Sequence, residues 1–295
     1  MSGITGIIIV DKPREFTSFD VVAVMRGLLR TKKVGHGGTL DPMATGVLPV
    51  FVGGATKAVD ILPDSDKGYR AGFSLGYKSD TLDIWGNVSG SGAADVPRAD
   101  LEKALGKFRG DIMQIPPMYS ALKVNGQKLC DLARKGIEVE RKPRPIRISR
   151  LECTEFDGQN GIIEVDCSSG TYIRSLIDDI GAELGTGAVM TSLVRTRACG
   201  FEISRSTPLD ALKKMDHEEL CGKILPVESV FSVLPRVELD EVQKRLYLNG
   251  VRLDCRRLSS NPPENGLCAV YGGEFLGVAR STSEGELASV KRFLS

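Results

Sequence analysis

Apolar residues along this chain follow two spacings, and these predict a mixture of strands and helices. Continuous apolar runs at residues 6–10 and 47–52 predict buried strands, and residues 67–76 alternate as a half-buried strand does. Apolar positions three and four residues apart predict a helix that begins at Thr17 or Ser18 and another that Thr171 caps. Further helices are predicted at residues 55–62, from residue 95 or 97 to 104, and as short pieces within 208–225.

The second half of the chain predicts more strands and a change of texture near residue 235. Residues 147–156 and 161–167 predict a pair of strands, and another strand is predicted through Leu193 and Phe201. The short strand candidates beyond residue 235 are 246–253, 267–271 and 275–280. Gly, Asn and Pro separate them, which is typical of a small β domain.

Composition describes an ordinary globular protein with no special class of site. The chain has 295 residues, which suits one large domain and a small one, with 41% hydrophobic and 26% charged residues. The apolar run near the start is too short to cross a membrane and has no basic residues before it, so no membrane span or secretory signal is expected. Seven scattered cysteines without a Cys-x-x-Cys indicate reduced thiols in the cytoplasm. With two histidines in the chain, we expect chemistry without a metal.

Positive charge is concentrated in one segment. The net charge is +1, but residues 123–150 hold nine Lys or Arg against three acidic residues, a net +6. A segment at about 117–147, rich in Gly and Pro, is therefore expected to project from the body. Its charge fits either a solvated loop or a surface that binds nucleic acid.

The strongest local pattern is the loop at residues 35–46, Gly-His-Gly-Gly-Thr-Leu-Asp-Pro-Met-Ala-Thr-Gly. Its four glycines permit backbone conformations that a Cβ would forbid, and Pro42 restricts the carboxylate residue before it, Asp41. Asp41 could form a turn, cap a helix or act as a nucleophile. The loop has neither the Gly-Lys-Ser/Thr of a P-loop nor a Gly-x-Gly-x-x-Gly fingerprint.

This loop resembles the signature of the TruB family of tRNA pseudouridine synthases, Gly-His-x-Gly-Thr-Leu-Asp-Pro-x-Ala-Thr-Gly. The run Gly-Thr-Tyr-Ile-Arg at residues 170–174 is similar to a second motif of that family. The resemblance implies that Asp41 is the nucleophile and that Tyr69 stacks on the target base. It also implies that Tyr172 borders the uridine pocket and that Arg174 pairs with the nucleophile.

Further positions receive roles from the same resemblance. Leu193 matches a pocket leucine, although Val194 departs from the Leu-Arg-Arg that is common in the family at this point. His36 matches a histidine that organises the target loop. Lys12 and Asp83 fall on family motifs as further substrate-binding residues.

The resemblance also gives the basic segment and the C-terminal part a purpose. The segment follows a Pro-Pro and a Ser-Ala-Leu-Lys motif and is similar to the family's thumb, which clamps the T arm of tRNA. Arg141, Lys142 and Arg144 are then expected to contact phosphates. The C-terminal part is similar to PUA-like RNA-binding domains.

Each assignment has a plainer alternative. Tyr69 could be a core tyrosine, and Tyr172 could pack against the helix cap. Arg174 lies in the first turn of its helix, where a cation opposes the helix dipole, so an anionic partner is expected. That partner could simply be Asp178, in a surface pair.

Together the patterns and the resemblance predict an α+β fold. The resemblance implies a mixed, mainly antiparallel sheet with flanking helices that form a catalytic cleft, and a small PUA-like β domain. The expected domains are residues 1–233 and 234–295. The expected function is conversion of uridine 55 in the T loop of tRNA to pseudouridine by a cytoplasmic monomer, without cofactor or obligate protein partner. Two rivals are a non-catalytic RNA-binding protein and a nucleoside glycosidase. The glycosidase would need a second carboxylic acid, and Asp83 is the one candidate that the sequence suggests.

Overall fold

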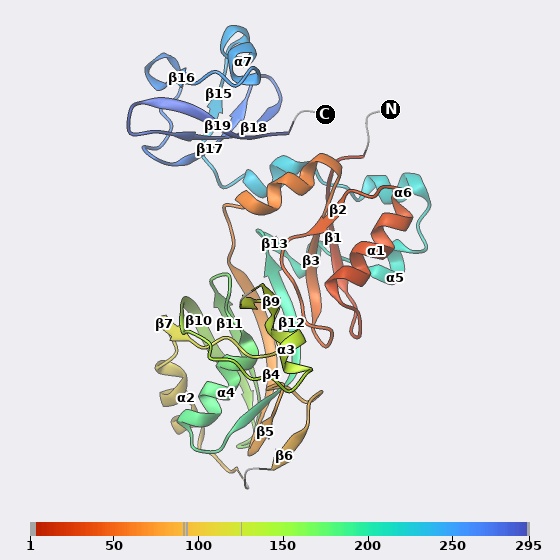
Figure 1. Ribbon diagram of the computed structural model, residues 1–295, viewed down its shortest axis with the longest axis vertical. Helices are drawn as coiled ribbons and strands as arrows, with labels where there is room; N and C mark the ends of the chain where they lie inside the picture. Colours follow the sequence, from red (N-terminus) through yellow and green to blue (C-terminus); the bar gives the residue numbers. More distant parts are fainter. Residues whose placement is uncertain (1–3, 91, 93, 125, 294–295) are drawn as a thin grey trace. The chain divides into compact units, whose positions relative to one another are not determined.

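The computed structural model describes residues 4–90, 92, 94–124 and 126–293, and the chain divides into two compact units (Figure 1). Unit 1 comprises Met1–Pro42, Gly46–Ser65 and Ala198–Ser295, and unit 2 comprises Met43–Thr45 and Asp66–Arg197. The chain thus crosses between the units at the loop that carries Asp41.

The first part of unit 1 holds paired strands of the ten-stranded sheet, and the strand β1 is covered on both faces. The elements of its first part are β1 (Gly6–Lys12), α1 (Ser18–Leu28), β2 (Val34–His36), β3 (Thr45–Val52), the 3₁₀ helix η1 (Gly53–Ile61), β13 (Phe201–Glu202), η2 (Ile203–Arg205), β14 (Thr207–Pro208), α5 (Leu209–Leu212), α6 (His217–Gly222) and η3 (Val227–Phe231). β1 pairs antiparallel with β3 and parallel with β14, and β2 pairs antiparallel with β3.

The continuous apolar run of β1 is explained by cores on both of its faces. Ile8 and Val10 pack with the buried face of α1, whereas Ile7 and Ile9 pack in a second cluster with residues of η1 and η3. Because alternate residues of a strand point to opposite faces, a strand covered on both sides reads as uninterrupted apolar sequence. The predicted strands at 6–10 and 47–52 are thereby confirmed.

A five-stranded sheet forms the C-terminal part of unit 1. Its elements are β15 (Arg236–Glu238), α7 (Glu241–Leu248), β16 (Leu253–Asp254), η4 (Cys255–Arg257), β17 (Leu267–Tyr271), β18 (Phe275–Ser281) and β19 (Glu286–Arg292), with strand order β15-β17-β18-β19-β16. This sheet has a core of its own, and it also contributes Ala269 and Val278 to the cluster that holds Phe231, together with Phe293, which follows β19. A small C-terminal β part is therefore confirmed, while the boundary at residue 234 stays a prediction.

The predicted strand at 246–253 is wrong over most of its length. Residues up to Leu248 belong to α7, which Asp240 begins through hydrogen bonds from the backbone of Val242 and Gln243. The side chain of Gln243 completes the capping box. The sequence carries this Asp-x-x-Gln signal, but the apolar run that follows favoured a strand.

Unit 2 is a sheet with two helices on one face. Its elements are β4 (Lys67–Leu75), β5 (Tyr77–Ser79), β6 (Val88–Gly90), α2 (Arg98–Gly106), β7 (Gly110–Gln114), β8 (Lys123–Val124), β9 (Gln127–Lys128), α3 (Leu129–Ala133), β10 (Arg144–Phe156), β11 (Asn160–Cys167), α4 (Ile173–Glu183) and β12 (Ala188–Ala198). The strand order is β12-β4-β11-β10-β7, and β4, β11, β10 and β7 pair antiparallel with one another in that order. The helices α2 and α4 pack on it through a layer of Phe73, Leu101, Leu105, Ile163, Ile177 and Ile180 (Figure 1).

These units confirm the predicted α+β class with a mixed sheet and flanking helices. Two local predictions differ. Thr171 does not cap α4, because Tyr172 occupies the cap position and the Thr171 hydroxyl donates to the carbonyl of Ser168. The strand predicted through Leu193 and Phe201 is interrupted where Cys199 and Gly200 both adopt a positive φ. None of the helices in the described part of the chain has the length and apolar character needed to cross a bilayer.

Candidate active site and nucleic-acid surface

The loop that carries Asp41 is held on both sides of the carboxylate residue. Before it, the backbone N–H of Leu40 donates to the hydroxyl of Ser18 at 2.8 Å. After it, the carbonyl of Pro42 accepts from the backbone N–H of Glu15 at 2.8 Å. Asp41 itself is partly exposed. The backbone on both sides of Asp41 is therefore held by the segment around the start of α1.

Lys12 supports this loop from inside unit 1. It is fully buried, and its Nζ donates to the carbonyls of Phe16 at 2.6 Å, Pro13 at 2.9 Å and Pro42 at 3.4 Å. The backbone of Gly46, at the other end of the loop, donates to Asp11 at 3.1 Å. Lys12 and Asp11, at the end of β1, are thus hydrogen-bonded to two points of the loop. This geometry gives Lys12 a positioning role, while its expected role in substrate binding stays a prediction.

His36 lies on β2 and contacts the exposed ring of Phe19 edge to face, with ring centroids 5.3 Å apart. Phe19 belongs to the first turn of α1, next to the Ser18 that holds Leu40. The histidine therefore packs against the same helix end that fixes the Asp41 loop.

In unit 2, the guanidinium of Arg174 is buried and coordinated by backbone. The residue is 5% exposed, and its Nη1 donates to the carbonyl of Thr81 at 2.9 Å, while Nη2 donates to that of Tyr119 at 2.8 Å. Asp83 Oδ2 lies 3.8 Å from Nη1. The alternative of a surface pair with Asp178 is wrong, because the side chain of Arg174 is buried. Burial of an arginine beside a carboxylate meets the expectation of an anionic partner.

Asp83 is itself fixed by its own loop. Its Oδ1 accepts from the hydroxyl of Thr81 at 2.7 Å and from the backbone N–H of Trp85 at 3.0 Å. The structure therefore joins two of the predicted site residues, Asp83 and Arg174. Their distance in the sequence gave no sign of this pair.

Tyr172 is positioned by a residue that the sequence did not single out. The side-chain amide of Gln114 donates to the carbonyl of Tyr172 at 3.0 Å and accepts from its N–H at 2.8 Å. Gln114 is buried at the end of β7, and Tyr172 is the N-cap of α4. The sequence signal was weak, since Gln114 followed by two prolines nearby reads as a loop.

Tyr69 and Leu193 lie on neighbouring strands. Tyr69 is on β4, where it pairs with Val165 of β11, and Leu193 is on β12, the other neighbour of β4. Both are nearly buried. Adjacent to them, the N–H of Gly72 donates to the hydroxyl of Ser192 at 3.2 Å, which fixes the β4–β12 register locally.

Some Arg side chains of the basic segment already form ion pairs or hydrogen bonds within the protein, whereas others are exposed. Arg147 pairs with Asp111 at 2.9 Å, and Arg141 is half-buried, with bonds to the carbonyl of Pro116 at 3.2 Å and to Glu138 at 3.3 Å. Lys142 and Arg144 are exposed and form no ion pair with a described residue. Of the three residues predicted to contact RNA, Lys142 and Arg144 are therefore the two whose charge is exposed and not already paired with a described acidic residue. Residue 125, within the same segment, lies outside the described residues.

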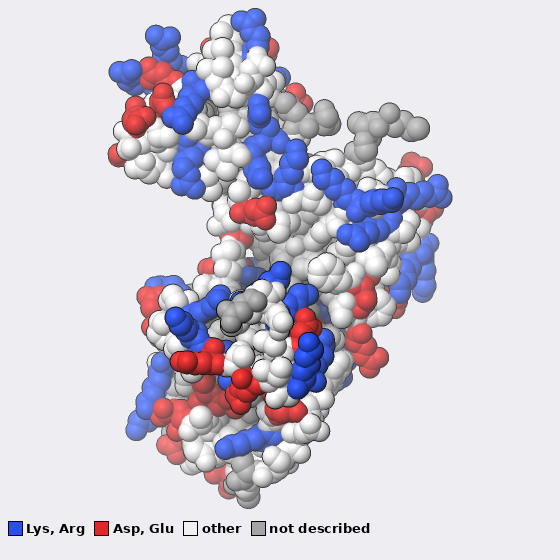
Figure 2. All heavy atoms as spheres, viewed as in Figure 1, with Lys and Arg blue, Asp and Glu red and all other residues white. Residues whose placement is uncertain are grey.

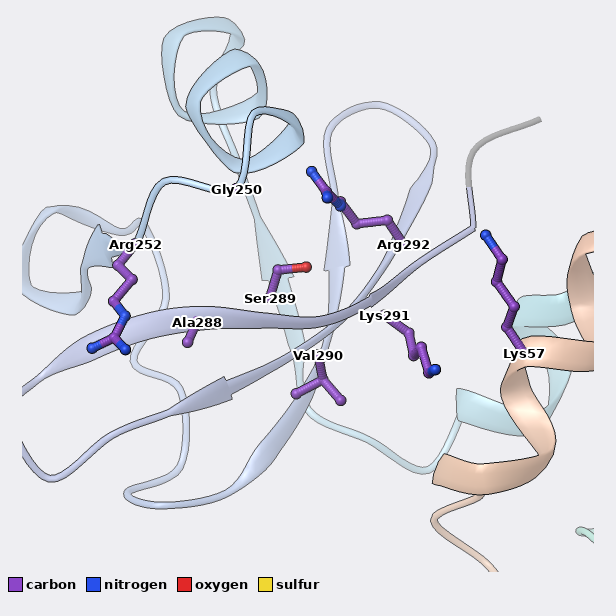
Figure 3. Close-up of a pocket in the computed structure, with 8 residues that line it drawn as sticks. All are labelled: Lys57, Gly250, Arg252, Ala288, Ser289, Val290, Lys291 and Arg292. Carbon is purple, nitrogen blue, oxygen red and sulfur yellow. The ribbon is translucent and has the colours of Figure 1, made fainter.

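A second basic surface lies in unit 1. A shallow hollow of about 580 Å³ is lined by Lys57 of η1, Lys291 and Arg292 of β19, and Arg252 before β16 (Figure 3). The four charged ends are spread around the hollow and do not converge on one point (Figure 3). Arg252 is partly neutralised by Glu286 at 2.9 Å. In Figure 2, Lys and Arg are prominent on the C-terminal part, with Asp and Glu among them at its left, and both signs are also mixed around α3.

Across the chain, the predicted residues fall into two groups. Lys12, His36 and Asp41 belong to unit 1, in and around one loop. Tyr69, Asp83, Tyr172, Arg174 and Leu193 belong to unit 2. Within the described residues, no group of three or more His, Cys, Asp or Glu side chains is arranged as metal ligands.

Comparison with known proteins gives the chain its family. Residues 26–173 match "TruB family pseudouridylate synthase (N terminal domain)" and residues 174–232 match "tRNA pseudouridylate synthase B C-terminal domain". A relative from Clostridium tetani, named tRNA pseudouridine synthase B, is 44% identical over 282 residues, which cover 95% of this chain and 96% of the relative. A protein of the same name from Pseudomonas fluorescens is 41% identical, with 97% of this chain and 94% of the relative covered.

Solved structures agree with this assignment. The chain is similar to one in a Cbf5-Nop10-Gar1 complex, with a TM-score of 0.77, 29% identity, and coverage of 98% of this chain and 85% of that chain. A chain in an H/ACA RNP bound to a substrate RNA containing 2'-deoxyuridine gives a TM-score of 0.75 at 26% identity, with coverage of 98% and 85%. The two family matches, and relatives above 40% identity over nearly the full length, place this chain in the TruB family of pseudouridylate synthases.

Proposed function

We propose that this protein converts uridine 55 in the T loop of tRNA to pseudouridine, with Asp41 as the nucleophile. The observation that supports this most directly is the rigid placement of Asp41, whose neighbours Leu40 and Pro42 are both hydrogen-bonded to the segment around the start of α1. Relatives above 40% identity over nearly the whole chain are named tRNA pseudouridine synthase B, which supports tRNA as the substrate.

The reaction asks little of a protein beyond one carboxylate and a shaped pocket. The bond between uracil N1 and C1′ breaks, the base turns, and C5 bonds to C1′. C5 loses its proton and N1 gains one, so the product is an isomer and no oxidant or hydrolytic water is consumed. Asp41 would serve either by attacking the sugar or by assisting elimination from it.

The remaining site residues are proposed to receive the flipped uridine. Tyr69 would stack on the base and offset part of the unstacking cost, and Leu193, on the strand beside it, would line the same pocket. Tyr172 would border the base, held in place by Gln114. Arg174 would bring its positive charge to the nucleophile, from a frame of carbonyls that already fixes its orientation.

RNA binding is proposed to use two basic surfaces. Lys142 and Arg144 extend from the segment that resembles the family's thumb, and the hollow around Lys57 and Lys291 lies at the C-terminal sheet. The spread of charge in the hollow suits a run of phosphates better than a single small anion (Figure 3). We further propose that the protein acts as a cytoplasmic monomer.

The two rival functions are less well supported. A pure RNA-binding protein has no use for a rigid carboxylate such as Asp41, which would repel phosphates. A nucleoside glycosidase would usually need a second carboxylic acid as proton donor. Asp83, the candidate for that role, accepts hydrogen bonds from Thr81 and Trp85 and lies beside Arg174, so its oxygens are occupied within its own surroundings.

One experiment separates the three functions. An unmodified tRNA transcript is incubated with the protein, and pseudouridine is mapped by chemical labelling while the RNA mass and free uracil are measured. We expect mass-neutral conversion at position 55 that Asp41→Asn abolishes while RNA binding remains. Free uracil would indicate a glycosidase, binding without conversion would indicate a pure RNA-binding protein, and full activity of Asp41→Asn would remove the proposed nucleophile.

A further inference from the structure

The loop that carries Asp83 also exposes two apolar side chains that are adjacent in the sequence. Ile84 is 39% exposed and Trp85 is 45% exposed, although Asp83 next to them is buried. Trp85 is the one tryptophan in the chain. Because the two side chains are neighbours, they form one small contiguous apolar patch, and contiguous exposed patches are the kind that mark binding sites.

This loop presents its tryptophan from a rigid frame. Asp80 accepts bonds from the backbone and the side chain of Asn87, both at 2.8 Å, and thereby closes the loop. The N–H of Ile84 donates to the carbonyl of Met190 at 3.0 Å, and the N–H of Trp85 donates to Asp83. Trp85 therefore has a fixed backbone, so ordering it on binding costs little entropy.

The same loop contacts Arg174, a residue of the proposed site. The carbonyl of Thr81 and the carboxylate of Asp83 both contact the guanidinium of Arg174. The backbone of Trp85 is bonded to that carboxylate, so Trp85 belongs to the segment that fixes Arg174.

We propose that Trp85, with Ile84 beside it, is a stacking platform for an unpaired RNA base next to the modified uridine. This rests on the proposed function, and it assigns Trp85 to a nucleotide that flanks the target. An indole face stacks on any base, with little dependence on sequence. The apolar area of two side chains fits one base and is far below the roughly 800 Å² per partner of a stable protein interface.

Because Trp85 is the one tryptophan, intrinsic fluorescence reports on this platform directly. The Asp41→Asn protein, which binds without turnover, is titrated with an unmodified T stem–loop RNA. We expect quenching of the emission with the same midpoint as binding measured by filter retention. An unchanged emission at saturating RNA would overturn the platform, whether or not the RNA is converted by the wild-type protein.

Kinetics of variants test the same point independently. Trp85→Ala should lower kcat/KM for the stem–loop roughly 5- to 20-fold, mainly through KM, and Trp85→Phe should restore most of it. Val88→Ala, an exposed apolar change on β6, the strand that follows this loop, is the matched control and should leave kcat/KM within about twofold. Wild-type kinetics in Trp85→Ala would overturn the platform and leave the proposed function standing. No conversion by the wild-type protein would overturn the function instead.

Discussion

At the scale of single residues, the most informative feature is how Arg174 is held. Its two terminal nitrogens each donate to a backbone carbonyl from a different loop, and a carboxylate lies beside them. A planar guanidinium can meet both carbonyls at once, whereas an ammonium on a flexible stem cannot hold the same fork. The side chain thus links α4 to two loops as well as carrying a charge.

We expect Arg174→Lys to destabilise the protein by about 1–3 kcal/mol, because at least one buried carbonyl loses its donor. Arg70→Lys is the matched control, since Arg70 pairs with Glu155 on the surface, and it should lower the free energy of unfolding by less than about 1 kcal/mol. Urea unfolding of the two variants measures both values. Equal losses of unfolding free energy in the two variants would show that the two buried hydrogen bonds of Arg174 add nothing to stability.

Gln114 allows a second test at this scale. Gln114→Ala would leave the N–H and the carbonyl of Tyr172 without their present partner, and we expect a loss of about 2–4 kcal/mol in unfolding free energy. Gln159→Ala removes one longer bond, 3.3 Å to the carbonyl of Leu75, and should cost less than half as much. Lower conversion of tRNA at a temperature where Gln114→Ala is still folded would show that Tyr172 needs this support.

Some of these residues can be recognised in the sequence and others cannot, for physical reasons. Arg174 was detectable because a cation in the first turn of a helix opposes the dipole, which is a local property. Gln114 was not, because its partner lies 58 positions away and a buried glutamine has no local signature. The burial of Lys12 was equally hidden, since three carbonyls brought together by tertiary structure solvate its charge.

At the scale of elements, α4 combines a site residue with a pair of half-buried carboxylates. Burial raises the pKa of Asp179 to about 6, and the neighbouring Asp178 adds to the shift. Burial also raises the pKa of Asp178, with Lys78 acting in the opposite direction. The helix that presents Arg174 therefore carries two carboxyl groups that bind a proton more tightly than an exposed aspartate does.

This gives a pH prediction with a definite sign. Between about pH 4 and 6 the folded protein keeps a proton on Asp179 that the unfolded chain has released, so this contribution to stability is lost as pH rises through that window. Asp179→Asn should raise the urea midpoint at pH 7.5 relative to wild type, with a smaller difference at pH 4.5. Asp210→Asn is the control of opposite sign, because Lys213 lowers the pKa of Asp210, and it should lower the midpoint at pH 7.5.

Elements also show which patterns can be read from sequence. The strand β1 was readable because cores on both faces make it continuously apolar, and α1 was readable because Thr17 and its capping box are local. The helix α7 was misread, since a capping signal competed with an apolar run, and packing decided between them. Sequence patterns thus predict elements well where local and tertiary preferences agree.

At the scale of the molecule, the C-terminal sheet shares a core with the first part of unit 1. Phe231 of η3 stacks with Phe275 and lies against Phe293, at ring centroid distances of 5.8 and 5.5 Å. These rings bring β18 and the end of β19 into the cluster that includes Ile7 and Phe51. No sequence pattern predicts this cluster, because its members come from segments that are far apart in the chain.

The two basic surfaces can be separated by using two lengths of RNA. The segment with Lys142 and Arg144 is proposed to clamp the T arm, so its charge reversal should weaken both an isolated T stem–loop and full-length tRNA. The hollow with Lys57 and Lys291 is proposed to meet tRNA beyond that arm, so Lys57→Glu with Lys291→Glu should weaken full-length tRNA alone. In each affected case, the slope of log K against log salt should fall by about one for each phosphate that the variant no longer neutralises.

Matched controls make this comparison decisive. Lys103→Glu reverses an exposed lysine of α2 that forms no ion pair with a described residue, and it should change neither affinity nor slope, since the added charge lies on neither surface. If the hollow variant weakens the isolated stem–loop as much as full-length tRNA, the C-terminal surface serves the T arm itself. If it weakens neither, this hollow takes no part in tRNA binding, and the phosphates must be bound by the thumb-like segment and by the loops around Asp41.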